Sequence, residues 1–152
     1  LIMKKVFITW IIVLLASTGL YAQESFFDKF ADRKGVTSVY ISKKMFGMMK
    51  NINNGNINLA NVADKINSLQ ILSCENKTVA DELRKETAHI NHKNGYEELM
   101  RIREEGERIT IYTKERAKEN EYVLLVDEPN EFVIILLNGQ LTLKELQGVI
   151  NH

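Results

Sequence analysis

The chain has 152 residues, 20 basic and 20 acidic, and 45% of its residues are hydrophobic. This length suits one domain with one core, and the balanced, interspersed charges exclude the basic surface of a nucleic-acid-binding protein or a polybasic membrane patch. Cys74 is the only cysteine, which excludes an internal disulfide.

Residues 1–22 have the pattern of a secretory signal peptide. Two lysines precede the apolar run Val6–Ala16, and Ala22 is a small residue at the expected cleavage position. The run is too short to span a bilayer, and no cysteine follows the cleavage position as it would in a bacterial lipoprotein. We therefore expect a single exported domain over residues 23–152, periplasmic or else extracellular, without stable membrane insertion after cleavage.

The first half of this domain predicts short helices that alternate with strands, from capping residues, apolar spacing and β-branched runs. Asparagine forms loops readily because it bonds its own backbone and tolerates positive φ. In chain order, we expect a helix over 25–34, a strand over 36–42, a helix from Ser42 to Met49, an asparagine-rich loop over 51–58, a helical segment over 59–66 and a strand over 69–74.

The longest helix is expected next. Thr78 is interpreted as its N-cap, and the helix is expected to end at Asn94-Gly95. Its apolar stripe consists of Val79, Leu83, Thr87 and Ile90. Such a stripe predicts that one side of the helix packs on the core.

The last third predicts an antiparallel meander followed by a helix. Its four extended runs are 97–103, 108–114, 122–127 and 131–137. The segment Phe132–Leu137 is apolar on both faces, so we expect a central strand that is covered twice, with Ile134 and Leu136 in the core. Thr142 and Glu145 form a capping box. The fold class is therefore α+β, an antiparallel-rich sheet with helices packed on it.

Several of these segments resemble a known group of sequences, domain-of-unknown-function family 4252. The segments that carry the resemblance are 27–30, 35–45, 69–72, 96–100, 124–127, 131–134 and 139–143. The segments are strand cores and helix caps, and the resemblance extends over essentially the whole mature chain. The resemblance implies an exported protein of Gram-negative bacteria, and it implies no activity, cofactor or catalytic residue.

A methionine cluster is the first candidate site. Met45, Met48 and Met49 have a spacing that places thioethers on one side of a helix, where they can bind copper(I). Methionine is also a pliable core filler, and Gly47 weakens the helix. We therefore expect burial of these side chains and no metal site.

His89 and His92 are a second candidate, for zinc, near the end of the longest predicted helix. Zinc needs a third protein ligand, and the sequence nominates none. Cys74 is interpreted as a half-buried strand end and not as a nucleophile.

Acidic residues near two arginines complete the candidates. Glu97, Glu98, Glu104 and Glu105 lie close in sequence to Arg101 and Arg103. The simplest interpretation is the polar side of a strand pair with cross-strand charge pairing.

No catalytic, cofactor or metal residue is thus nominated. The leading hypothesis is an exported, non-catalytic envelope module that binds a protein or a small ligand. The alternatives are an accessory component of an envelope signalling system with an alternative sigma factor, an enzyme whose site forms only in three dimensions, and, as the weakest, a metal-binding protein.

Overall fold

The computed structural model describes residues 26–51, 53–54, 57–58 and 61–150. The large sheet consists of β1 (Val36–Ser42), β4 (Ile66–Cys74), β5 (Glu97–Glu104), β6 (Glu107–Glu115), β7 (Asn120–Asp127) and β8 (Phe132–Gly139). The α-helices are α2 (Phe26–Ala31), α3 (Lys43–Met48), α4 (Lys77–Thr87) and α5 (Leu143–Ile150). Short elements are the 3₁₀ turns η1 (Met49–Asn51), η2 (Ala63–Lys65) and η3 (His92–Asn94) and the strands β2 (Asn53–Asn54) and β3 (Ile57–Asn58).

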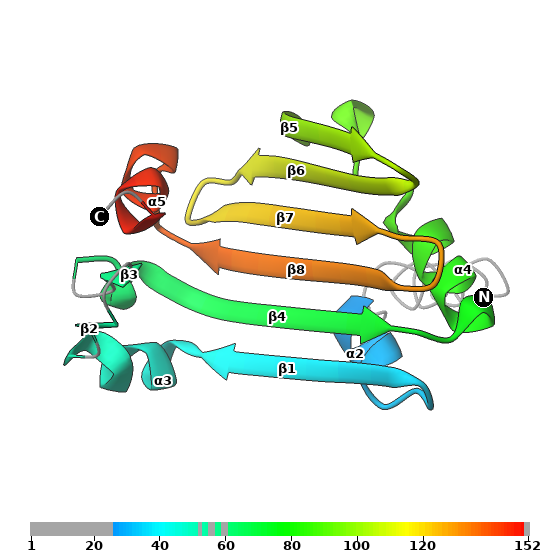
Figure 1. Cartoon of the computed structure of the whole chain (residues 1–152). Coiled ribbons are helices and arrows are strands. Elements are labelled where there is room, and N and C mark those ends of the chain that lie inside the picture. Colours follow the sequence, from blue (N-terminus) through cyan, green and yellow to red (C-terminus); the bar gives the residue numbers. More distant parts are fainter. Residues whose placement is uncertain (1–25, 52, 55–56, 59–60, 151–152) are drawn as a thin grey trace, which may run out of the picture.

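The six-stranded sheet has the order β1-β4-β8-β7-β6-β5, and every neighbouring pair is antiparallel. Strands β5 to β8 form the predicted meander, and β1 and β4 extend it beyond β8 (Figure 1). The predicted α+β class is confirmed. The central position of β8, between β4 and β7, is confirmed as well.

The main core lies between one face of the sheet and the helices α2 and α4, which lie behind the sheet in Figure 1. It is built from Phe27, Phe30, Leu72, Cys74, Val79, Ala80, Leu83, Ile90, Tyr96, Val123, Phe132 and Ile134. All four residues of the stripe predicted for the longest helix are buried, and Thr87, the last residue of α4, and Ile90, beyond its end, are each 6% exposed. Leu136 is half-buried against this core.

A second, smaller core closes one end of the sheet. It consists of Phe46, Val62, Ile66, Tyr122 and Leu141. A register shift in β4 between Ile66 and Ser68 turns the Ile66 side chain into this cluster. Gly139 lies opposite Ile66, where a Cβ atom would stand 2.3 Å from the carbonyl oxygen of Lys65. Only glycine fits this close approach of two backbones.

Two predicted helix caps and one hairpin turn follow from local sequence. The Ser42 cap is confirmed, since its side chain accepts a hydrogen bond from Met45 N–H at the start of α3. The capping box is confirmed too, because Thr142 Oγ1 accepts from Glu145 N–H at 3.2 Å. The turn between β5 and β6 has φ of 40° at Glu105 and 85° at Gly106, as in the tight hairpin turns that need two positive φ values.

The Thr78 cap is wrong. The N-cap is Asn76, whose Oδ1 accepts from Val79 N–H at 3.2 Å, and α4 begins at Lys77. The helix also ends earlier than expected, at Thr87. Past that point Asn91 caps the separate turn η3, and Gly95 takes a φ of 87°.

The helical segment predicted over 59–66 is also wrong where the structure describes it. Only the single turn η2 is helical, and Ile66 already belongs to β4, because its side chain is needed in the second core. The asparagine-rich loop contains the short pair β2 and β3. The predicted signal peptide lies outside the described residues. Among the residues that are described, no helix is both long and apolar enough to cross a membrane.

Candidate functional site

The sheet face opposite α2 and α4 is the most distinctive surface of the protein. The expectation that β8 is covered on both faces is wrong over much of its length. Ile134 faces the helices and is 1% exposed, whereas its neighbours Val133 and Ile135 point to the other side and are only half-buried. In Figure 1, no described helix or strand lies over the middle of β8 on that side.

Two cross-strand rows make up this surface, which we call the open face. The register of the five strand pairs places the members of each row side by side across all six strands. The first row is Val39, Ile71, Ile135, Leu124, Ile111 and Met100, and the second is Thr37, Ser73, Val133, Val126, Ile109 and Ile102.

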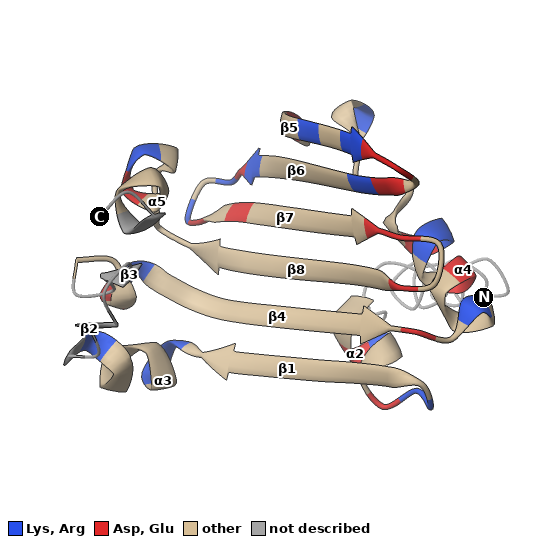
Figure 2. Ribbon diagram, in the orientation of Figure 1, with Lys and Arg blue, Asp and Glu red and all other residues tan. Residues whose placement is uncertain are grey.

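The open face is apolar and carries no charge. Ten of its twelve side chains are hydrophobic, and the other two are the hydroxyl residues Thr37 and Ser73. None of the twelve is buried, and Val39, Met100 and Ile102 are 40%, 49% and 43% exposed. Figure 2 shows β1, β4 and β8 without a charged residue along their length.

The size of the open face follows from strand geometry. Six strands about 4.8 Å apart and two rows about 6.8 Å apart give a footprint of about 400 Å². A footprint of this size is in the range of the largest apolar patch on a typical soluble monomer, about 300 to 600 Å², and such a patch is often functional. The open face therefore has the properties of a docking surface.

The second core bounds the open face at one end. The next row along the strands contains Ile41, Leu69, Leu137 and Tyr122, and these side chains pack with Phe46 and Leu141. Tyr122 also donates a hydrogen bond to the Leu141 carbonyl oxygen at 2.9 Å. At the opposite end, Thr37 and Ser73 line a surface pocket of about 360 Å³.

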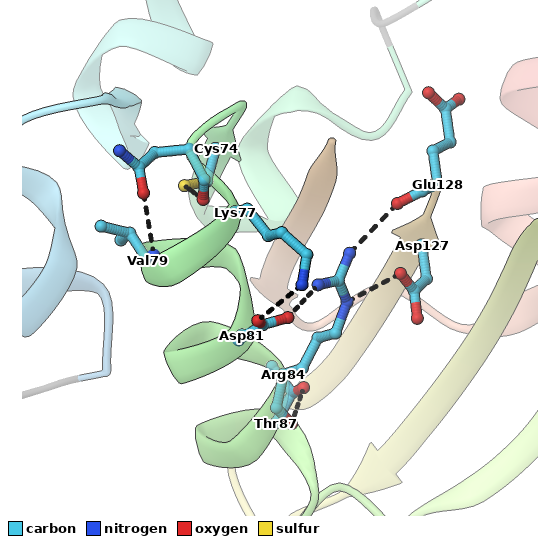
Figure 3. A network of polar contacts seen from close by, with 9 residues as sticks. Cys74, Lys77, Val79, Asp81, Arg84, Thr87, Asp127 and Glu128 are labelled. Atoms are coloured by element: carbon cyan, nitrogen blue, oxygen red, sulfur yellow. Dashed lines mark hydrogen bonds and ion pairs between the residues drawn. The ribbon is translucent and has the colours of Figure 1, made fainter. Parts of the chain in front are cut away.

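Arg84 is the centre of a polar network on the other side of the sheet (Figure 3). Its Nε donates to Asp127 Oδ1 at 2.8 Å, and its two terminal nitrogens donate to Asp81 Oδ1 and to the Glu128 carbonyl oxygen. The guanidinium also lies 5.4 Å from the ring centre of Phe132. Each nitrogen of the guanidinium makes one contact within the protein, so Arg84 fastens α4 to the β7–β8 turn.

Tyr96 and Glu121 form a second internal polar contact. The Tyr96 hydroxyl donates to Glu121 Oε1 at 2.9 Å, and Arg116 pairs with Glu121 Oε2 at 2.7 Å. Burial and the hydrogen bond to Glu121 raise the pKa of Tyr96 to about 12. This contact joins the start of β5 to β7 and neutralises a carboxylate that is 8% exposed.

The expected burial of the methionine cluster is wrong. Met45 and Met48 are 48% and 72% exposed, and Met49 is half-buried. Phe46 is the residue of α3 that enters the second core, at 5% exposure. The Phe46 ring therefore fills the core position at which we expected the three methionine side chains.

His89 and His92 do not share one helix, because α4 ends at Thr87 and His92 begins η3. His89 Nδ1 is hydrogen-bonded to the Glu86 carbonyl oxygen. Cys74 is the last residue of β4, as expected, but its expected half-burial is wrong: it is fully buried, with its thiol 3.4 Å from the Asn76 carbonyl oxygen. Within the described residues, no three His, Cys, Asp or Glu side chains converge as a metal site would require.

The cross-strand charge pairing expected around β5 is also wrong. Arg101 binds Glu98 of its own strand at 2.6 Å. The register places Arg103 opposite Arg108 and Glu104 opposite Glu107. At this hairpin end Arg103, Glu104 and Arg108 are exposed and Glu107 is half-buried, so solvent screens the like charges.

These features define an α+β protein whose antiparallel sheet is covered by helices on one face and largely open on the other. The chain belongs to a family described as a domain of unknown function (DUF4252), whose model matches residues 27–149. No curated protein and no solved structure shows significant similarity to it.

Sequence reasoning did not nominate the open face. A signal was present, because the strand 132–137 is apolar on both faces and 123–126 likewise carries apolar residues in consecutive positions. The run 132–137 was interpreted as double burial, which is the usual reason for such a run.

Proposed function

We propose that this protein is an exported, non-catalytic binding module of the bacterial envelope that docks an apolar protein surface on its open face. The observation that carries the proposal is the uninterrupted pair of rows from β1 to β5, in which no side chain is charged and none is buried. Export rests on the leader pattern of residues 1–22.

The chemistry of the open face selects the class of partner. A charged partner surface would lose its hydration against ten hydrophobic side chains and gain no counter-charge there. An apolar, uncharged surface has no charged groups whose hydration could be lost, and its burial contributes about 25 cal/mol of free energy per Å². The partner is therefore expected to present its own neutral, apolar patch.

The shape of the open face favours a protein over a small molecule. Small ligands bind in concave sites that enclose most of their surface. The open face is one side of a sheet, and the pocket near it touches only its corner, at Thr37 and Ser73. A broad partner surface can cover both rows at once.

The internal polar groups support a non-catalytic role. Arg84 and Glu121 each bind more than one partner within the protein. Their contacts hold elements together on the helix-covered side, away from the open face.

The test compares two matched lysine substitutions in the mature protein. Met100→Lys places a charge on the open face, and Met45→Lys makes the same change at a methionine of equal exposure in α3, 49% against 48%. Each variant is used to capture proteins from the native envelope, and urea unfolding confirms that both are folded. We expect a partner that wild type and Met45→Lys retain and Met100→Lys loses.

The recovered partner is then purified and titrated against all three proteins. Binding that Met100→Lys weakens about tenfold, with Met45→Lys unchanged, supports the open face as the site. Equal binding by the two variants, or a partner lost only with Met45→Lys, would place the interaction elsewhere and refute the proposal.

A further inference from the structure

The two edge strands of the sheet differ sharply in their protection. Strand β5 has a register shift between Glu98 and Met100 and carries charged residues at both ends and in its middle. Bulges and charges are the devices by which proteins prevent edge strands from pairing with another chain. Strand β1 has the sequence Val-Thr-Ser-Val-Tyr-Ile-Ser, without a charge, proline, glycine or bulge.

The outer edge of β1 is also accessible. All seven residues pair with β4 in an unbroken register on the inner side. On the outer side, no strand of the described residues is a neighbour. Four consecutive residues, 37–40, are exposed, with Tyr40 at 57%. The strand therefore offers an extended row of backbone donors and acceptors.

We propose that β1 pairs antiparallel with β1 of a second copy, which joins two sheets into one of twelve strands. A two-fold axis at Val39 aligns the full strands and sets Ser38 opposite Tyr40 and Thr37 opposite Ile41. Each of these pairs combines uncharged side chains that suit a sheet. A second β1 has the same uncharged sequence, so the two strands complement each other across the two-fold axis, as in isologous dimers.

The pairing completes the open face, so the inference deepens the proposed function and rests on it. The two-fold axis is perpendicular to the sheet, and both open faces therefore lie on the same side. The two Val39 rows become one continuous row. A single open face of about 400 Å² is about half of what one partner contributes to a standard protein interface, whereas two together reach about 800 Å². A stable docking surface is incomplete without the second copy.

The first experiment measures the mass of the mature protein by sedimentation velocity from about 1 to 200 µM. We expect a dimer that Tyr40→Lys weakens by about tenfold or more, because each introduced charge lies beside the seam and diagonally across it from its symmetry mate, about 7 to 8 Å away. Met100→Lys leaves β1 unchanged, and it should remain as dimeric as wild type. Tyr40 is not part of the open face, so the two variants separate the two proposals.

The second experiment places a cysteine at the proposed axis. Val39→Cys brings two thiols to facing positions, where paired residues of antiparallel strands have Cα atoms about 4.5 to 5.5 Å apart, within the range of a disulfide. Mild oxidation should give a covalent dimer with Val39→Cys and little with Met100→Cys, which lies on the opposite edge strand.

Three results would overturn the inference. One is a monomeric wild type at the highest concentration. Another is a dimer that Met100→Lys abolishes and Tyr40→Lys does not, which would indicate face-to-face packing of two open faces. The third is equally fast crosslinking at positions 39 and 100. A monomer that still binds its partner through the open face would leave the proposed function intact.

Discussion

Ile134 and Ile135 are adjacent residues of β8 with the same side chain, and they lie on opposite faces of the sheet. Ile134 pairs with Leu72 and Leu125 under the helices and is 1% exposed. Ile135 pairs with Ile71 and Leu124 on the open face and is half-buried. One strand therefore contributes to the core and to the candidate docking surface at successive positions.

This relationship predicts a large difference in stability between two otherwise identical substitutions. Ile134→Ala should lower the free energy of unfolding by about 2 to 5 kcal/mol, because it leaves a cavity in the core. Ile135→Ala removes the same atoms from a half-exposed site and should cost about 1 kcal/mol or less. Urea denaturation of both variants measures the difference. Equal midpoints would mean that the open face is covered in solution.

Asn76 is predicted to contribute to stability through its cap of α4. Asn76→Ala removes the acceptor of the Val79 N–H and should cost about 1 kcal/mol. Thr78→Ala is the matched control, because Thr78 is exposed within the first turn and alanine has a higher helix propensity. Thermal unfolding followed by circular dichroism distinguishes the two. A larger loss with Thr78→Ala would contradict the assignment of the cap.

Local signals explain what the sequence could predict. The period of β-branched residues over 36–42 and the capping box at Thr142 depend on neighbours in sequence, and both are confirmed. The end of α4 at Thr87 was missed because the stripe continues to Ile90, which is buried from a non-helical position.

The coverage of a sheet face is not a local property. Ile134 and Ile135 have nearly the same sequence surroundings, and only the distant helices α2 and α4 determine which of them is buried. The contrast between the unprotected edge strand β1 and the charged edge strand β5 is not a local property either. Strand β1 becomes an edge only through its pairing with β4 and the pairing of β4 with β8. An apolar run therefore predicts a strand without stating what covers it.

The raised pKa of Tyr96 predicts a pH dependence of stability at the alkaline end. The phenol ionises near pH 10 in the unfolded chain and near 12 in the folded protein. Between these values the unfolded state has lost a proton that the folded state retains, so the free energy of unfolding falls as pH rises. Urea midpoints from pH 9 to 11.5 should fall more steeply for wild type than for Tyr96→Phe. Parallel curves would show that Tyr96 does not titrate differently on folding.

Export predicts a defined mature N-terminus. When the full chain is expressed in a Gram-negative host, the intact mass of the exported protein should correspond to a start at Gln23, within one or two residues. A charge in the apolar run, as in Leu14→Arg, should leave an uncleaved precursor. A protein that retains residues 6–15 after export would contradict the signal-peptide interpretation.

The last prediction concerns metal binding, because methionine and histidine side chains are ligands for copper(I) and zinc. Titration of the apo protein with copper(I) or zinc should show no one-to-one site tighter than micromolar. Zinc requires at least three protein ligands, whereas His89 already engages Nδ1 with the Glu86 carbonyl and His92 lies in a separate turn. Copper(I) requires thioethers held together, whereas Met48 is 72% exposed on a helix of six residues and nothing in the described structure fixes its position.

Competition with chelators of known affinity gives the measurement, and Met48→Leu and His92→Ala are the informative variants. The open face contains one methionine, Met100, and no histidine or cysteine, so neither metal should change partner binding there. A nanomolar one-to-one site that either variant abolishes would refute this prediction. It would also shift the candidate site from the sheet to α3 or to the segment that follows α4.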